Sequence, residues 1–195
     1  MNPVLKRFLI AGVAALPCAA SQWTVDPAHS SATFAVKHMM VSTVRGSFTG
    51  IKGIVDYDPA NPSATKTSFT IDAATVDTRN DDRDKDLKGE NFFDVRKYPT
   101  ITFVSKRLRQ EGPGKLQLVG DITIHGVTKE VAFEVNGPTP PVKDMRGTLH
   151  VGGSATTTLN RKDFGLIWNK NLDGGGVMVG DDVDITVDVD LVQQK

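Results

Sequence analysis

The stretch that decides the fold reads Val183-Asp184-Ile185-Thr186-Val187-Asp188-Val189-Asp190-Leu191. Apolar and polar side chains alternate through it without a break, and only an extended strand separates such a pattern into two different faces. Similar alternation recurs at residues 29–38, 67–73, 115–124 and 131–135. Nearly the whole chain is therefore expected to form antiparallel β-sheet with a polar outer face and an apolar inner face.

Turn-forming residues divide the chain at short intervals, and no long tract rich in Pro, Gly or Ser separates the strand-like runs. The pattern predicts one domain of eight or nine strands, which fits either a closed up-and-down barrel or a two-sheet sandwich. Glycines inside several runs favour the barrel, because glycine lets a strand bend where a sheet curls on itself. The expected strands span residues 22–26, 29–38, 44–57, 66–76, 100–108, 115–124, 127–136, 145–157 and 182–192.

One segment departs from the strand pattern. Residues 78–89 are densely charged, with acidic residues first and a Lys-Gly pair last, which is the order that favours a short helix. We expect this helix to lie across one mouth of the barrel, with Leu87, Phe92 and Phe93 turned inward. The pattern leaves open whether the helix seals the core or gates a ligand.

The N-terminus has the layout of a secretory signal peptide. Residues 1–20 place basic residues before an apolar run at 8–16, and small residues follow up to Ala20, after which we expect cleavage. The apolar run is about half the roughly 20 residues that a membrane-spanning helix needs. Cys18 raises a lipoprotein anchor as an alternative, which the preceding proline disfavours. The expected mature domain is residues 21–195, exported, without cysteine and not membrane-spanning.

The charge balance argues against a nucleic-acid partner. The whole chain has 23 basic and 23 acidic residues. The leader contains two of the basic residues and none of the acidic ones, so the mature protein has a net charge of −2. Basic and acidic residues are also interleaved throughout, whereas a protein that binds phosphate backbones normally shows a basic excess or a basic stripe.

The histidines do not predict a metal site. A zinc centre would need three of them, or two and a carboxylate, to converge. His29, His38, His125 and His150 show no spacing typical of ligands, so each is expected to be a structural residue. His38 shares the strand parity of inward apolar residues, whereas His29 has the opposite parity near the start of its strand.

An aspartate series at Asp82, Asp84 and Asp86 resembles the start of a calcium loop. The sixth position of that loop requires glycine and the twelfth requires glutamate, but this chain has Leu87 and Phe93 there. A solvated helix face is therefore the better interpretation. The chain also lacks a nucleophile elbow and a phosphate-binding glycine loop, so neither a hydrolase with a serine or cysteine nucleophile nor a bound cofactor is expected.

Several motifs occur in an order that points to one family. They are Asp26-Pro27-Ala28-His29-Ser30 with Phe34 and His38, Gly46-Ser47-Phe48, Val76-Asp77-Thr78, Arg83-Asp84, Asn91-Phe92-Phe93-Asp94, Tyr98-Pro99-Thr100-Ile101-Thr102-Phe103, residues 120–129, and Asn160-Arg161-Lys162-Asp163-Phe164-Gly165. As an ordered set, these motifs strongly resemble the YceI-like family of polyisoprenoid-binding proteins.

The resemblance implies a lipocalin-like antiparallel barrel of eight strands, exported to the periplasm, with a long isoprenoid chain in its apolar interior and no catalysis. One departure is visible in the charged helix. Many members carry a histidine before its leucine, where this chain has Asp86-Leu87. If that histidine helps to bind a ligand head group, the preference for a head group differs here.

The leading hypothesis is a protein that binds, stores or transports a polyisoprenoid such as a quinone or a prenyl lipid. Two alternatives remain: a lipid-modifying enzyme that uses His38 with a carboxylate such as Asp163, and a structural barrel with a filled core. The sequence does not decide whether two copies pair as a homodimer. The expected ligand-binding residues are Phe34, Val36, His38, Phe48, Phe69, Ile71, Phe103, Ile122, Ile124, Phe133, Leu149, Phe164, Leu166, Trp168, Arg161 and Asp163.

Overall fold

The computed structural model of the chain describes residues 21–57, 61–112 and 115–194, so the expected signal peptide lies outside the described residues. Almost all regular structure in these residues is β-sheet. The strands are β1 (Ser21–Val25), β2 (Ser31–His38), β3 (Ser42–Phe48), β4 (Ile51–Tyr57), β5 (Lys66–Asp72), β6 (Val76–Asp77), β7 (Thr100–Gly112), β8 (Lys115–Ile124), β9 (Val127–Asn136), β10 (Val142–Lys143), β11 (Leu149–Asn160) and β12 (Val179–Gln193). The helices are η1 (Pro62–Ala64), η2 (Ala73–Thr75), α1 (Asp81–Lys88) and η3 (Arg161–Phe164).

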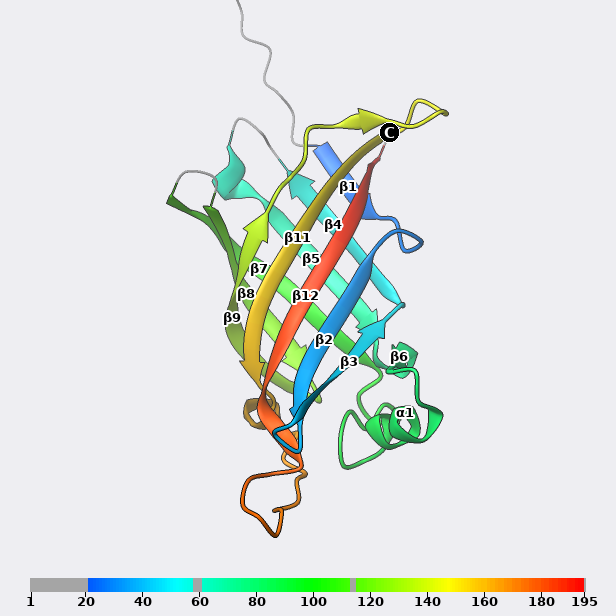
Figure 1. The fold of residues 1–195 in the computed structure, drawn as a ribbon. Helices are drawn as coiled ribbons and strands as arrows, with labels where there is room; N and C mark the ends of the chain where they lie inside the picture. The colour runs from blue at the N-terminus through cyan, green and yellow to red at the C-terminus, as the bar shows by residue number, and fades with distance from the viewer. Residues whose placement is uncertain (1–20, 58–60, 113–114, 195) are drawn as a thin grey trace, which may run out of the picture.

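Eight of the strands form a closed antiparallel ring in the order β11-β9-β8-β7-β5-β4-β1-β12, and β12 returns to pair with β11 (Figure 1). The closure confirms the predicted barrel and excludes the two-sheet sandwich. Closing the ring also satisfies the backbone groups that an open sheet would leave unpaired at its edges.

Strand β12 is the longest strand and changes partner along one edge. Its residues 191–193 pair with β1, whereas residues 179–188 pair with β2. Its other edge pairs with β11 along that strand's whole length from residue 150 to residue 160. Strands β1 and β2 therefore follow one another along the same edge of β12 and together form one side of the barrel.

The predicted single strand at 44–57 is wrong in one respect, because the chain bends at Gly50 and forms two strands. Strand β3 pairs with β2 and β6, whereas β4 pairs with β1 and β5. At the bend the backbone passes close to Thr75, since a Cβ on Gly50 would lie 2.9 Å from Cγ2 of that threonine. The N–H of Gly50 also donates to the Thr75 hydroxyl at 3.1 Å.

The predicted helix is confirmed and lies near one mouth of the barrel (Figure 1). The side chain of Asn80 accepts a hydrogen bond from the N–H of Arg83 at 2.9 Å, which caps the first turn. Leu87 and Phe93 pack against the barrel core, as expected. Phe92 instead faces Trp168, with a ring separation of 5.4 Å.

None of the helices in the described part of the chain has the length and apolar character needed to cross a bilayer.

A buried arginine organises the loop that follows β11. The guanidinium of Arg161 donates to the carbonyl oxygens of Leu166, Trp168 (2.9 Å) and Gly180 (2.8 Å), and lies 3.4 Å from the carboxylate of Asp181. Burial lowers its pKa from the ordinary arginine value, because desolvation disfavours the charged form. The planar fork of donors satisfies several carbonyls at once, which a lysine cannot do.

We expect Arg161→Lys to lower the free energy of unfolding by about 3 kcal/mol, because it leaves buried carbonyl groups without a donor. The matched control is Lys162→Met, which removes an exposed amine that is ion-paired with the same Asp181 at 2.8 Å. Its effect should stay below about 1 kcal/mol. Urea unfolding followed by tryptophan fluorescence measures both variants, and equal losses would contradict the structural role of Arg161.

Candidate functional site

The inward faces of the strands surround two apolar cavities and a cleft that follow one another through the barrel. The first cavity, called here the inner chamber, has a volume of about 110 Å³. Eight of the sixteen predicted ligand-binding residues line it: Phe34, Phe48, Phe69, Ile71, Phe103, Ile122, Ile124 and Phe133. Alternation along the strands suggested these residues, and in the structure all eight lie around the inner chamber.

The second cavity, called here the far chamber, has a volume of about 140 Å³. It adjoins the inner chamber, because both are lined by Phe69, Leu118, Ala155 and Val187. Its walls also include Trp23 and other residues that were not among the predicted site residues. Sequence parity could have found those that alternate along a strand, such as Val187, Val189 and Leu191, but not the consecutive residues 152–154. Nothing in the sequence ranked one inward residue above another.

The mouth cleft lies beyond the inner chamber at the end that α1 covers, and its volume is about 440 Å³. Phe34 lines both spaces and so joins them. Three further predicted residues, Val36, His38 and Trp168, line the cleft. Charged residues of both signs also line it, namely Lys37, Arg83, Lys85, Asp86 and Glu90.

The guanidinium of Arg83 is already occupied in the mouth cleft. Its Nε donates to the Thr78 hydroxyl at 2.7 Å and its Nη2 donates to the Thr78 carbonyl at 2.9 Å. The N–H and hydroxyl of Thr78 in turn donate to the carboxylate of Asp84 at 2.8 and 2.6 Å. This network anchors α1 over the mouth, so Arg83 has a structural role.

Five predicted site residues line none of these three spaces. Phe164 and Leu166 are buried in the main core, and Leu149 packs at the edge of a second apolar cluster. Arg161 is buried among the loop carbonyls described above. Asp163 is exposed on η3.

Three phenylalanine rings around the chambers lie against glycines of neighbouring strands. Phe34 faces Gly46, and Phe69 faces Gly53 in the strand register. The ring of Phe103 lies against Gly120 in the same way. A Cβ on any of these glycines would collide with the ring. The missing side chains therefore let the rings lie along the barrel wall, which leaves room at its axis.

The two chambers offer very little polar chemistry. In the part of the chain that the structure describes, no charged side chain lines either of them. Two buried polar atoms at the far chamber, Nε1 of Trp23 and Oγ1 of Thr67, have no hydrogen-bond partner among the residues that the structure describes. Trp23 and Thr67 lie on either side of Val55 in the sheet, because Val55 of β4 pairs with Trp23 of β1 and with Thr67 of β5. Unpaired buried polar groups are rare and call for an explanation.

Comparison with known proteins gives the same architecture. The chain is 38% identical over 163 residues to the UPF0312 protein SAS2572 of Staphylococcus aureus, a match that covers 84% of this chain and 92% of that protein. Among solved structures, BcnA of Burkholderia cenocepacia superposes with a TM-score of 0.72 at 25% identity, covering 85% of this chain and 98% of that one.

Two further solved structures share the barrel. The YceI protein of Campylobacter jejuni has a TM-score of 0.67 at 29% identity and covers 82% of this chain and 90% of that one. A polyisoprenoid-binding domain from Saccharophagus degradans has a TM-score of 0.63 at 13% identity, covering 90% and 99%, and therefore shares the fold alone.

The model of the YceI-like domain matches residues 23–191, which span the whole ring of strands from β1 to β12. With this match and the apolar barrel that these residues build, the chain belongs to the YceI-like family.

Proposed function

We propose that this protein binds a long-chain polyisoprenoid lipid, a quinone or a prenyl lipid, in the apolar interior of its barrel, and stores or transports it. The observation that carries the proposal is the pair of adjoining chambers whose described lining has no charged side chain. Such a space favours hydrocarbon over water. The polyisoprenoid-binding domain of Saccharophagus degradans has the same fold, which supports the choice of lipid.

Transfer of hydrocarbon from water supplies the driving force. Each buried methylene-sized group contributes about 0.8 kcal/mol. The transfer free energy of a prenyl tail of tens of carbons is therefore more than enough to drive binding. The cost of ordering a flexible chain offsets part of this energy and limits the affinity. The protein's contribution is a dry, elongated space, which the phenylalanine and β-branched side chains provide.

The volumes indicate how a long tail fits. Chambers of about 110 and 140 Å³ are each smaller than an ordinary small-molecule pocket of roughly 300–1,000 Å³. They are nevertheless larger than a few waters, because one buried water occupies about 10–15 Å³ by the same kind of measure. A long tail therefore extends through both chambers and the mouth cleft, and side chains between them move aside to admit it.

The geometry gives less support to the alternative functions. For an acid–base enzyme, His38 and Asp163 would need to meet at one site, but His38 lines the mouth cleft and Asp163 is exposed on η3. For a barrel with a filled core, the two chambers would have to be absent. Membership of a family of binding domains also favours a non-enzymatic protein.

The periplasm is the proposed location, because the first twenty residues have the three-part layout of a secretory signal peptide. N-terminal sequencing of the protein recovered from its host's periplasm should begin at Ser21. The same preparation, extracted with organic solvent, tests the proposed function directly. Mass spectrometry should identify a polyisoprenoid in about equal molar amount to the protein, and a preparation without any prenyl compound would contradict the proposal.

The junction between the chambers provides a steric test. Gly53→Ala places a Cβ 2.3 Å from the Phe69 ring and 2.9 Å from the carbonyl oxygen of Ser68. The strand must therefore shift slightly, and the ring must turn into the space that joins the chambers. We expect affinity for an octaprenyl ligand to fall at least tenfold, while affinity for a short farnesyl ligand that needs only the inner chamber changes little. Fluorescence titration with both ligands measures the difference.

Two variants control this test. Phe69→Ala in the Gly53→Ala background removes the displaced ring and should restore binding of the long ligand. Gly174→Ala is the matched control, because a Cβ there lies more than 4 Å from every other part of the chain that the structure describes. Equal loss of both ligand lengths, or no recovery in the double variant, would show that Phe69 does not control the passage.

The unpaired atoms of Trp23 and Thr67 favour a ligand whose neutral head group accepts hydrogen bonds at the far chamber. A quinone carbonyl meets this requirement. The double variant Trp23→Phe, Thr67→Val should weaken binding of a prenylated quinone about thirtyfold, since it removes two hydrogen bonds that each contribute on the order of 1 kcal/mol. Binding of squalene, which has no acceptor, should stay the same, and a parallel loss of both ligands would refute the orientation.

A further inference from the structure

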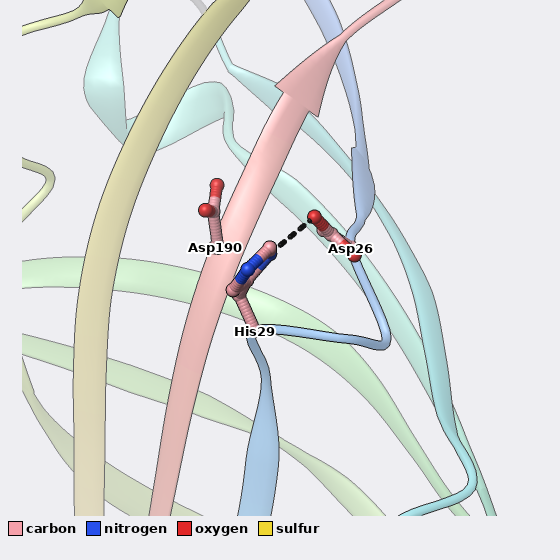
Figure 2. A group of neighbouring side chains, drawn as sticks. All are labelled: Asp26, His29 and Asp190. Atoms are coloured by element: carbon pink, nitrogen blue, oxygen red, sulfur yellow. Dashed lines mark hydrogen bonds and ion pairs between the residues drawn. The ribbon is translucent and has the colours of Figure 1, made fainter. Parts of the chain in front are cut away.

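A group of imidazole and carboxylate side chains lies on the outer wall of the barrel, away from the chambers. Asp26 and His29 belong to the turn between β1 and β2, and Asp190 points outward from β12 (Figure 2). One ligand atom from each of these three residues lies within 4.8 Å of the other two. Nδ1 of His29 is 2.7 Å from Oδ2 of Asp26.

A second histidine borders this group. Nδ1 of His150, on β11, is 2.8 Å from Oδ1 of Asp190. On its other side, Nε2 of His150 is 3.7 Å from the carboxylate of Asp144. His150 therefore fixes the orientation of the Asp190 carboxylate, as outer-shell residues do around metal ligands.

The backbone holds the two aspartates in place. The N–H of Ala28 donates to Oδ1 of Asp26 at 2.9 Å, so the other oxygen of that carboxylate points toward His29. The N–H of Asp26 donates to the carbonyl of Asp190 at 2.8 Å, which joins the turn to β12. The hydroxyl of Ser30 accepts the N–H of Asp190 at 2.9 Å. These bonds fix the ligand positions independently of any ion.

The charge of the group is unbalanced. Asp26, Asp144 and Asp190 bring three carboxylates together, and within the described residues their only ion-pair partners are His29 and His150. No lysine or arginine of that part of the chain forms an ion pair with any of the three. The group has a charge of −3 when both imidazoles are neutral and −1 when both are protonated, so its charge is negative in either state and a divalent cation would offset it.

We propose that Asp26, His29 and Asp190 bind a divalent transition-metal ion of the zinc type, with His150 as the residue that positions Asp190. One imidazole nitrogen and two carboxylate oxygens are ligands that Zn²⁺ accepts, and an exposed site leaves a fourth position for water. Tetrahedral zinc with bonds of about 2.0–2.1 Å spaces its ligand atoms roughly 3.3 Å apart. Nδ1 of His29 and Oδ2 of Asp26, now 2.7 Å apart, must therefore separate slightly to admit the ion. His29 is exposed and can make this adjustment.

The site joins segments that are distant in sequence, which explains why histidine spacing did not reveal it. His29 and Asp190 meet only because β12 runs beside β1 and β2. A bound ion would connect the β1–β2 turn to β12, where the ring closes. Metal binding should therefore stabilise the folded barrel in proportion to its occupancy.

The test uses the untagged mature protein and Zn²⁺ alone. Isothermal titration calorimetry should show one ion bound per chain, and thermal unfolding with excess Zn²⁺ should raise Tm by several degrees. His29→Ala and Asp26→Asn should each weaken binding at least tenfold and remove most of the rise in Tm. The change in His29→Ala affects an exposed side chain, and circular dichroism verifies its fold.

Asp188→Asn is the matched control, because Asp188 is exposed and lies two residues before Asp190 on the same outward face of β12. It should bind Zn²⁺ as the wild type does. His38→Ala, which changes a histidine of the mouth cleft, should also leave binding unchanged. The proposal is overturned if the wild type does not bind Zn²⁺ at 100-fold molar excess, or if His29→Ala and Asp26→Asn bind it as tightly as the wild type.

Discussion

The hydrogen bonds that β12 forms on both of its edges hold the barrel closed. One edge pairs with β11, and the other pairs first with β2 and then with β1. Every other feature of the protein follows from this closure. The apolar residues of β12 form one wall of the chambers, and its outward aspartates include the one that meets His29. An open sheet would expose the apolar residues of β12 to water and would separate Asp190 from His29.

The closed ring would enclose only a packed core if every inward position had a large side chain. The glycines at positions 46, 53 and 120 prevent this, because phenylalanine rings from neighbouring strands lie against them. Because these glycines have no side chain, the large rings can lie flat along the barrel wall. Two chambers remain, joined where Phe69 lines both. The cost is conformational, since glycine in a strand weakens it by lost backbone entropy.

Strand periodicity predicted the fold well, because alternation in a strand depends only on which face is buried. The same rule suggested eight of the residues that line the inner chamber, and the order of charges in residues 78–89 predicted the helix that spans Asp81–Lys88. Periodicity failed where the chain changes partner, as at Gly50, because pairing partners are not encoded locally. It also missed the surroundings of Arg161, whose hydrogen bonds reach to Gly180 and Asp181, and the meeting of His29 with Asp190. Those contacts depend on the closed topology and have no signature in spacing.

The position of β12 in the chain has a consequence for how the protein is made. Its partners β1 and β2 are synthesised first, and they wait without it until residues 179–193 have left the ribosome. Until β12 has paired, the ring stays open and the apolar inward faces of the other strands lack the wall that Ile185, Val187 and Val189 supply. The ring therefore closes only when the last strand of the chain has paired along both of its edges.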